Sequence, residues 1–277
     1  MRLRPEPGDD GHYMSTDRTA SLPAMLDLTG RTALITGARR GIGRAIALGF
    51  AAQGACVAVH YAGADEEADA ASVLAEIERN GGGASLFAAD FAAPGSGTRL
   101  ATEIHDRLGH VDILVLNASI ELLENYDAIS QEHFDRQIAI NLRAPLELLQ
   151  SLLPPMTARG WGRILAIGSI QQLRPHPKML VYAGTKSAQL NWVRSLARQV
   201  GGKGVTVNNL APGAILTARN GDRLADPAIR RQVEQRIPAG RLGTPNDLVG
   251  AALLLCSDAG AYINGADLSV DGGLGVA

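Results

Sequence analysis

The chain has 277 residues, of which 46% are hydrophobic and 19% are charged, a composition typical of a globular protein with a sizeable core. Its formal net charge of -2 offers no basic surface for nucleic acid, and no apolar run reaches the roughly 20 residues of a membrane span. We therefore expect neither a nucleic-acid partner nor a membrane.

The N-terminal residues 1–25 carry Pro, Gly and Asp without periodicity, and they lack the apolar segment of a secretory signal. We interpret them as a disordered or loosely packed tail, followed by one folded domain over residues 26–277. The only cysteines, Cys56 and Cys256, lie in apolar runs outside any metal-type spacing. Buried free thiols in a reducing, cytoplasmic compartment are expected, with a disulfide or redox pair as the weaker alternative.

From residue 31 onward, short apolar segments alternate with longer helical ones. The expected strands are 31–37, 55–62, 84–90, 111–119, 162–169, 204–213 and 266–273. The expected helices are 42–53, 64–81, 97–109, about 130–158, about 180–200 and 245–258. Nearly continuous apolar strands that alternate with helices indicate an α/β fold with a parallel sheet, covered by helices on both faces.

A glycine-rich segment, T-G-A-R-R-G-I-G at 36–43, lies between the first strand and the first helix. Gly37, Gly41, Ile42 and Gly43 belong to it. Glycines in this context permit a tight turn and let the backbone approach a pyrophosphate, which rests on the helix N-terminus. The alternative is an ordinary strand-to-helix turn whose glycines serve packing only.

Two arginines inside this loop bear on the choice of dinucleotide. The second strand ends at His60 and Tyr61, and no carboxylate that could bind a ribose 2′-hydroxyl follows before Asp65. Arg39 and Arg40 suit a 2′-phosphate, because guanidinium pairs well with phosphate. NADP(H) is therefore favoured, whereas NAD(H) remains the alternative if both arginines are solvated loop charges.

Asp90 and Phe91 follow the third strand. Asp90 could accept a hydrogen bond from the adenine amino group, or it could cap the next segment. We include both residues among the candidates for cofactor binding, together with His60 and Tyr61.

At this point the chain resembles the single-domain short-chain dehydrogenase/reductase family over residues 26–277. The resemblance rests on T-G-A-R-R-G-I-G, Asn117-Ala118, Asn141, Ser169, Tyr182-x-x-x-Lys186, Pro212-Gly213 with Thr217, and V-D-G-G at 270–273. It implies a doubly wound, Rossmann-type sheet of seven strands. It also implies hydride transfer between a nicotinamide and a carbonyl or secondary alcohol, and a homotetramer. By position, Asn141, Ser169, Tyr182 and Lys186 match the family's catalytic residues.

Tyr182 and Lys186 share one face of the expected helix. A phenol could act as general acid or base, but its ordinary pKa of about 10 is too high for work near neutrality. Lowering it to about 7 needs roughly 4 kcal/mol, which one ammonium about 4 Å away supplies at an effective dielectric of 20. An exposed aromatic–cation pair without function is the alternative.

The other matched residues have expected roles and plainer alternatives. Ser169 would bind the substrate oxygen, or merely cap the strand end. Asn141 would hold a water that links Lys186 to solvent, or serve as a structural hydrogen-bonder.

Two further segments follow the sixth strand. In A-P-G-A-I-L-T at 211–217, Pro212, Gly213, Ile215 and Thr217 would contact the nicotinamide and pyrophosphate, unless the segment is an ordinary proline turn. Residues 214–240 are polar and rich in arginine, which is typical of a mobile lid or of a solvated helix pair.

The substrate is the least determined part. The closest overall likeness is to 3-oxoacyl-(carrier protein or CoA) reductases, and this is the leading interpretation. Gln171, Gln172 and His176 between Ser169 and Tyr182 favour the alternative, a sugar, polyol or other polar ketone. An acidic carrier protein would need a basic patch, for which Arg159, Arg163, Arg198 and Lys203 are candidates unless they are scattered solvated charges.

No metal-ligand set is visible in the sequence. A non-catalytic dinucleotide sensor is a distant alternative, because such proteins typically lose the tyrosine or lysine that this chain keeps.

Overall fold

The computed structural model describes residues 21–218 and 221–277. Its centre is one parallel sheet in the order β3-β2-β1-β4-β5-β6-β7, which confirms the predicted seven-stranded α/β architecture. The strands are β1 (Thr32–Ile35), β2 (Cys56–Tyr61), β3 (Gly83–Ala88), β4 (Ile113–Leu116), β5 (Gly162–Ile167), β6 (Val205–Pro212) and β7 (Asp267–Val270). Each lies inside a predicted range, or starts one residue before it at Gly83.

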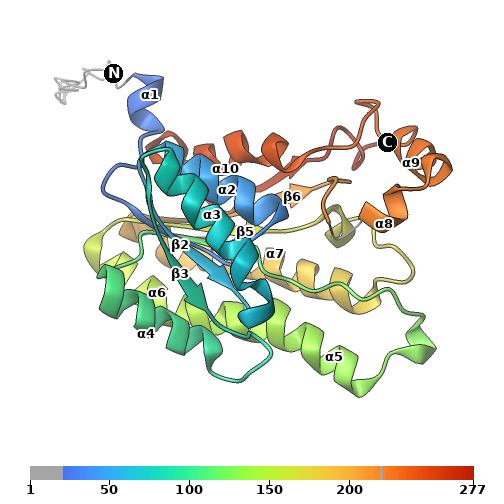
Figure 1. The fold of residues 1–277 in the computed structure, drawn as a ribbon, viewed down its shortest axis with the longest axis horizontal. Coiled ribbons are helices and arrows are strands. Elements are labelled where there is room, and N and C mark those ends of the chain that lie inside the picture. Colours follow the sequence, from blue (N-terminus) through green and yellow to red (C-terminus); the bar gives the residue numbers. More distant parts are fainter. Residues whose placement is uncertain (1–20, 219–220) are drawn as a thin grey trace, which may run out of the picture.

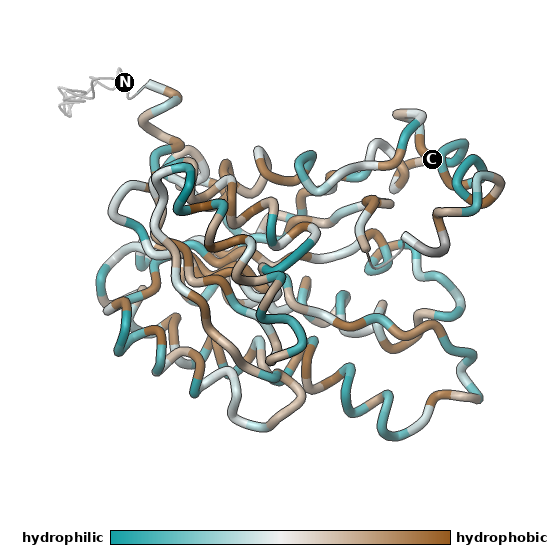
Figure 2. Tube along the Cα trace, in the orientation of Figure 1, coloured by the Kyte–Doolittle hydropathy of each residue, from teal (hydrophilic) through white to brown (hydrophobic). Residues whose placement is uncertain are grey.

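Helices cover both faces of the sheet (Figure 1). They are α1 (Leu22–Met25), α2 (Gly41–Ala52), α3 (Glu67–Arg79), α4 (Ser96–Leu108), α5 (Gln131–Ile138), α6 (Ala144–Arg159), α7 (Leu180–Val200), α8 (Gly221–Leu224), α9 (Pro227–Glu234) and α10 (Val249–Cys256). One apolar cluster joins α2, α3 and α10 to the sheet, and another joins α4, α6 and α7 to its other face. The most hydrophobic segments accordingly run through the centre (Figure 2).

The order of the strands reverses direction between β1 and β4. From β1 the chain proceeds to β2 and β3 on one side, whereas β4 to β7 follow on the other. In such sheets a crevice opens beyond the carboxyl ends of the strands at the point of reversal, and ligands bind there. The topology therefore places the ligand site beyond Ile35 and Leu116.

The single helix expected over about 130–158 was wrong in one respect. A wide π-helical turn, η3 (Ala139–Arg143), separates α5 from α6. Pro145 lies four residues after Asn141 and has no N–H to donate to the Asn141 carbonyl, so regular α-helical hydrogen bonding fails there. Such turns are frequent at functional sites, and this one contains Asn141.

Parts of the predicted N-terminal tail (residues 1–25) and of the predicted lid (residues 214–240) lie outside the described residues. Residues 1–20 lie outside, and the rest of the expected tail forms α1, none of whose residues is buried. Residues 219–220 within the expected lid also lie outside. The remainder of that segment contains α8 and α9, anchored by a small apolar cluster of Leu224, Ile237 and Leu242. Lid motion stays a prediction.

The two cysteines are free thiols, with Cys256 buried and Cys56 partly buried. Burial raises the pKa of both. None of the helices in the described ranges combines the length and apolar character that crossing a bilayer requires.

The buried His60 at the end of β2 holds three strand ends together. The Gly37 amide donates to its Nδ1 at 2.9 Å, so Nε2 carries the hydrogen and donates to Ala89 O at 2.9 Å. Its ring stacks on Phe91, with 4.2 Å between centroids. Burial lowers the pKa of His60 to about 4. The neutral ring thus links the loop after β1 to the ends of β2 and β3.

Because His60 is buried in its neutral form, the free energy of unfolding of the protein depends on pH. Between pH 6.5 and about 4 the unfolded chain binds a proton at His60 while the folded chain does not, so the free energy of unfolding falls as the pH is lowered through this window. The contribution is roughly 3 kcal/mol. We expect His60→Gln, which does not titrate, to show a flatter pH dependence in urea unfolding followed by circular dichroism.

The matched control is His105→Gln on the exposed face of α4. It should retain the wild-type pH dependence. An equally steep dependence in His60→Gln would contradict the role assigned to the buried ring.

Candidate active site

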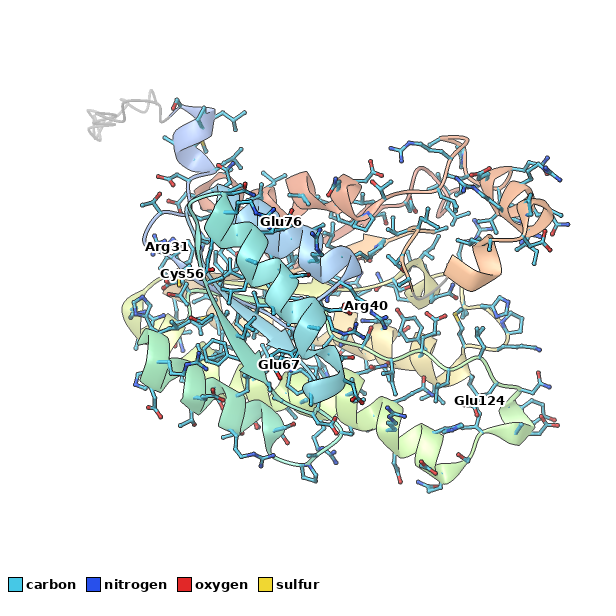
Figure 3. The ribbon with its side chains drawn as sticks, viewed as in Figure 1. Arg31, Arg40, Cys56, Glu67, Glu76 and Glu124 are labelled. Atoms are coloured by element: carbon cyan, nitrogen blue, oxygen red, sulfur yellow. The ribbon has the colours of Figure 1, made fainter. Side chains whose placement is uncertain are left out.

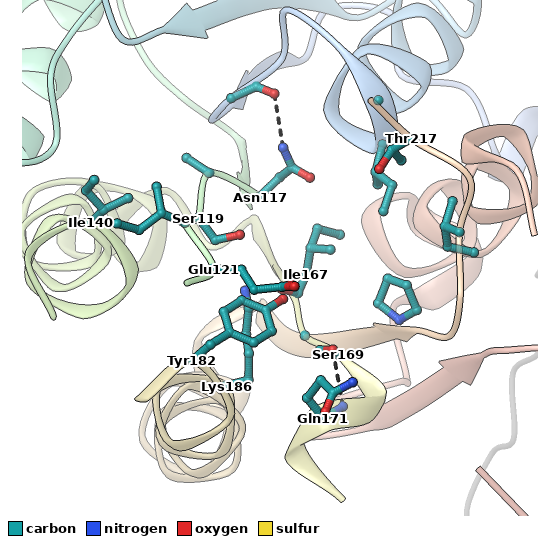
Figure 4. Close-up of a pocket in the computed structure, with 18 of the residues that line it drawn as sticks. Asn117, Ser119, Glu121, Ile140, Ile167, Ser169, Gln171, Tyr182, Lys186 and Thr217 are labelled. Atoms are coloured by element: carbon teal, nitrogen blue, oxygen red, sulfur yellow. Dashed lines mark hydrogen bonds between the residues drawn. The ribbon is translucent and has the colours of Figure 1, made fainter. Parts of the chain in front are cut away.

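A cleft of about 530 Å³ opens at the carboxyl ends of the strands, where the topology predicts it (Figure 4). Most of the candidate residues line it, namely Gly37, Arg39, Arg40, Gly41, Ile42, His60, Asp90, Phe91, Asn117, Ala118, Ser169, Gln171, His176, Tyr182, Lys186, Pro212, Gly213, Ile215 and Thr217. Four candidates do not line it: Gly43, Tyr61, Asn141 and Gln172. The tertiary structure therefore brings together residues from both halves of the chain.

The glycine loop leaves room for a ligand at the N-terminus of α2. Gly41 has φ +58°, and a Cβ there would lie 3.5 Å from Thr217 Cγ2, so a side chain would enter the cleft. A Cβ at Gly43 would approach Gly37 O to 2.4 Å and Asn117 Nδ2 to 2.5 Å. Gly43 thus serves close packing rather than direct contact. A side-chain-free cradle at a helix N-terminus fits a pyrophosphate.

A polar network joins this loop to the end of β4. The side-chain amide of Asn117 donates from Nδ2 to Thr36 O at 2.8 Å and to Gly37 O at 3.1 Å. The Thr36 hydroxyl accepts from the backbone amides of Asn117 and Ala118, each at 2.9 Å. The sequence analysis quoted Thr36 as the first residue of the glycine motif but assigned it no role. The network fixes the cleft wall that Asn117 (Figure 4) and Ala118 form.

The two arginines of the loop have different surroundings. Arg39 is mostly buried and pairs with Glu66 at 2.7 Å and Asp69 at 2.6 Å. Arg40 is exposed at the N-cap of α2 (Figure 3), and it has no ion-pair partner among the side chains that the structure describes, which leave out residues 1–20, 219–220 and 222–223. Glu66, which the sequence analysis did not single out, also lines the cleft and accepts from the Ala62 amide at 3.0 Å.

Of the candidate residues at the end of β2 and after β3, some line the cleft and one belongs to the core. Asp90 lines the cleft, and its Oδ1 accepts from the Ala92 amide at 2.9 Å. Phe91 lines the cleft while stacking on His60. Tyr61 instead packs in the apolar cluster beneath α2 and α3. Tyr61 therefore supports the site from behind.

Tyr182 and Lys186 project from the first half of α7 into the cleft (Figure 4). The Lys186 Nζ lies 5.6 Å from the centroid of the Tyr182 ring. It donates to Ile167 O at 2.7 Å and to Gln189 Oε1 at 3.1 Å. Lys186 is 1% exposed, so its ammonium depends on these acceptors from β5 and α7.

Ser169 follows β5 and lines the same part of the cleft, where its Oγ accepts from the Gln171 amide at 3.2 Å. Asn141 is fully buried and lies behind the cleft wall. Its side chain exchanges two hydrogen bonds of 2.9 Å with the backbone of Ile120 and donates to Thr185 Oγ1 at 3.2 Å. The Asn141 side chain thus connects the loop after β4 to α7.

Of the three polar residues that were predicted to contact the substrate, two line the cleft and one does not. Gln171 and His176 line the cleft, and Gln171 Oε1 accepts from the His176 amide at 2.6 Å. Gln172 points toward β7 instead, where its amide donates to both carboxylate oxygens of Asp267 at 2.9 and 2.8 Å. Adjacent residues in this turn face different sides, which the sequence alone did not indicate.

Several cleft residues were not among the sequence candidates. They include Ser119, Glu121, Arg136, Ile140, Met179, Leu224, Val233 and Leu274. Glu121 follows β4 closely, a position at which polar residues could have been considered. Leu274 comes from the C-terminal segment, and no local sequence signal identifies it.

None of the four basic residues considered for a carrier-protein patch lines the cleft. Arg163, at the start of β5, is 3% exposed and donates to Ser257 O at 3.1 Å. Arg159 donates to Val111 O at 2.8 Å. Both lie toward the amino ends of the strands, opposite the cleft, so they do not form a patch beside it.

Comparisons with known proteins identify the family of the chain. A family model described as enoyl-(acyl carrier protein) reductase matches residues 37–275. The L-rhamnose 1-dehydrogenase (NADP(+)) of Thermoplasma acidophilum is 39% identical over 251 residues, which cover 90% of this chain and 98% of that protein. The 7alpha-hydroxysteroid dehydrogenase of Escherichia coli is 39% identical over 252 residues, which cover 90% and 95%.

Among solved structures, a 3-oxoacyl (acyl-carrier-protein) reductase of Agrobacterium tumefaciens with NADP bound has a TM-score of 0.87 and 41% identity. The match covers 92% of this chain and 98% of that one. The resemblance found in the sequence is therefore confirmed. The chain belongs to the short-chain dehydrogenase/reductase family, whose members act on CH–OH groups with NAD(P).

Proposed function

We propose that this oxidoreductase uses NADP(H) to interconvert a polar, hydroxylated carbonyl compound and its alcohol, with Tyr182 as general acid and base. The observation that carries the proposal is the pairing of Tyr182 with a buried Lys186 at a cleft whose lining also includes the polar side chains of Glu121, Gln171 and His176. When bound, the nicotinamide would supply or accept the hydride. The side-chain-free cradle at Gly41 and the N-terminus of α2 would hold its pyrophosphate.

Three residues of the chain have distinct roles in the proposed reaction. Tyr182 gives a proton to the carbonyl oxygen during reduction and takes one from the hydroxyl during oxidation. The Lys186 ammonium favours the phenolate form of Tyr182 and would bind the ribose hydroxyls of the cofactor. Ser169 would donate a hydrogen bond to the substrate oxygen as negative charge develops on it.

Replacing Tyr182 with Phe tests the proton-transfer role. We expect Tyr182→Phe to lower kcat at least about 100-fold, because a positioned acid–base group contributes 10² to 10⁴. The dissociation constant of NADPH, measured by fluorescence titration, should change little.

The control is Tyr262→Phe, whose parent side chain is fully exposed. It should retain wild-type kcat. Substantial turnover by Tyr182→Phe would exclude the proposed mechanism.

The lining of the cleft supports a polar substrate over an acyl thioester. Glu121, Gln171 and His176 offer hydrogen-bonding groups to hydroxyls near Tyr182. The related L-rhamnose dehydrogenase acts on such a molecule. The second candidate, a 3-oxoacyl thioester, is supported by the structural neighbour named a 3-oxoacyl reductase. The position of Arg159 and Arg163 at the amino ends of the strands argues against docking of an acidic carrier protein at this cleft.

A substrate panel distinguishes these two classes. We expect measurable oxidation of aldoses such as L-rhamnose or of polyols with NADP+, at a higher kcat/KM than acetoacetyl thioesters show in reduction with NADPH. Glu121→Gln should raise the KM for the best neutral sugar, since the carboxylate accepts stronger hydrogen bonds than an amide. A preference for the thioester would select the second candidate.

The choice of NADP(H) rests on Arg40. The charge of Arg39 is already matched by Glu66 and Asp69, whereas Arg40 is exposed at the mouth of the cleft. Glu66 lines the same end and could bind a ribose 2′-hydroxyl, which keeps NAD(H) as the second coenzyme.

Arg40→Ala should therefore weaken NADPH binding by about tenfold, which is the loss of one charge-assisted contact of roughly 1.4 kcal/mol. NADH binding should stay within twofold. Arg79→Ala, at the exposed end of α3, is the control and should affect neither coenzyme. Equal weakening of both coenzymes by Arg40→Ala would contradict recognition of the 2′-phosphate.

A homotetramer remains a proposal from the family resemblance. It is supported by an apolar groove on α6 and α7 that is lined by Leu146, Leu149, Leu153, Trp192, Leu196 and Val200. A second copy of the chain would cover such a surface. A monomer in sedimentation analysis would contradict this proposal. A cytoplasmic location likewise stays a proposal, which the two free cysteines support.

A further inference from the structure

The side chain of Gln189 connects two of the residues matched to the catalytic set. It lies one turn after Lys186 on α7, and it is 3% exposed. Its Oε1 accepts from Lys186 Nζ at 3.1 Å, and its Nε2 donates to the backbone carbonyl of Asn141 at 2.7 Å. Only this orientation of the amide matches an ammonium donor and a carbonyl acceptor.

The Asn141 carbonyl needs this donor because of its place in the chain. In an α-helix it would accept from the amide four residues later, but that residue is Pro145. A buried carbonyl without a donor costs about 1–3 kcal/mol. Gln189 satisfies it from the neighbouring helix α7. The amide of Gln189 therefore meets a requirement that Pro145 and the turn η3 create.

The ammonium of Lys186 is held from two directions. Ile167 O at the end of β5 accepts at 2.7 Å, and Gln189 Oε1 accepts from within α7. The interaction of an ammonium with a nearby phenolate depends on their separation, so a shift of Lys186 Nζ changes its effect on Tyr182. The hydrogen bonds to Ile167 and Gln189 restrict the position of Lys186 Nζ and so contribute to this separation.

The sequence analysis placed a water between Asn141 and Lys186, and the Gln189 amide now lies between these two groups. We propose that Gln189 is a positioning residue, which holds the Lys186 ammonium in register with Tyr182. The inference rests on the proposed function, because it assigns Gln189 a part in the same proton transfer. The amide of Gln189 is covalently fixed to α7, the helix that also carries Tyr182 and Lys186.

Kinetics of Gln189→Met provide the first test. Methionine keeps the length and burial of the side chain but removes both hydrogen bonds. We expect kcat to fall by about 10- to 100-fold, the loss that a displacement of about 1 Å produces, while the KM of the alcohol substrate stays within twofold. Asn191→Leu, on the exposed face of α7 two residues later, is the control and should retain wild-type kcat.

Titration of Tyr182 in the cofactor-free protein provides a second test that needs no turnover. The ultraviolet absorbance of the phenolate is followed against pH, and Tyr182 is isolated by subtracting the same titration of a protein that carries Tyr182→Phe. The other charged or titratable residues that line the cleft are Arg39, Arg40, His60, Glu66, Asp90, Glu121, Arg136, His176 and Lys186. They are common to every protein compared, so their contribution cancels to first order.

In Gln189→Met the Tyr182 titration should move about one pH unit to the alkaline side, which corresponds to tenfold less phenolate at a given pH. Gln189→Leu likewise removes both hydrogen-bonding groups without adding a charge, so it should move the titration in the same direction. It also serves if Gln189→Met fails to fold.

An unchanged Tyr182 titration in the folded variants would overturn the proposal. So would a kcat that falls only in proportion to the folded fraction seen by circular dichroism. If the wild type turns over no alcohol or carbonyl, the proposed function fails, while the titration still decides the role of Gln189.

Discussion

The Lys186 ammonium is a positive charge buried inside the fold, and the elements around it are arranged to match it. A buried charge without partners costs several kcal/mol. Ile167 at the end of β5 and Gln189 on α7 accept from it, and Gln189 is in turn bound to Asn141 between α5 and α6. This chain of contacts fixes β5, α7 and the broken helix relative to one another, and Tyr182 lies on the element at its centre.

At the other end of the cleft, hydrogen bonds between neutral groups hold the glycine loop in place. His60 and Thr36 tie the glycine loop to β2, β3 and β4, and both are buried. The loop can therefore present its backbone amides to an anion without rearranging, which is how a preorganised site avoids paying ordering entropy on binding. In the proposed function, the exposed Arg40 then distinguishes one dinucleotide from the other.

Much of this architecture could be predicted, because its signals are local. The alternation of apolar strands with helices indicated the parallel sheet, and the glycine loop and Tyr182-x-x-x-Lys186 indicated the site. Other features depend on which way a side chain turns. Gln171 faces the cleft while Gln172 binds Asp267, and Arg39 is matched by Glu66, a residue 27 positions later. The hydrophobic periodicity of the sequence does not indicate which side chains pair in this way.

The sequence by itself determined the fold class and the chemistry, because hydrophobic period and the spacing of Tyr182 and Lys186 are properties of neighbouring residues. The tertiary structure decided what surrounds that pair. Pro145 is visible in the sequence, but only packing of α7 against the turn η3 brings Gln189 to the Asn141 carbonyl that the proline leaves without a donor. Buried polar groups must find partners wherever the folded chain supplies them, and those partners can lie far away along the sequence.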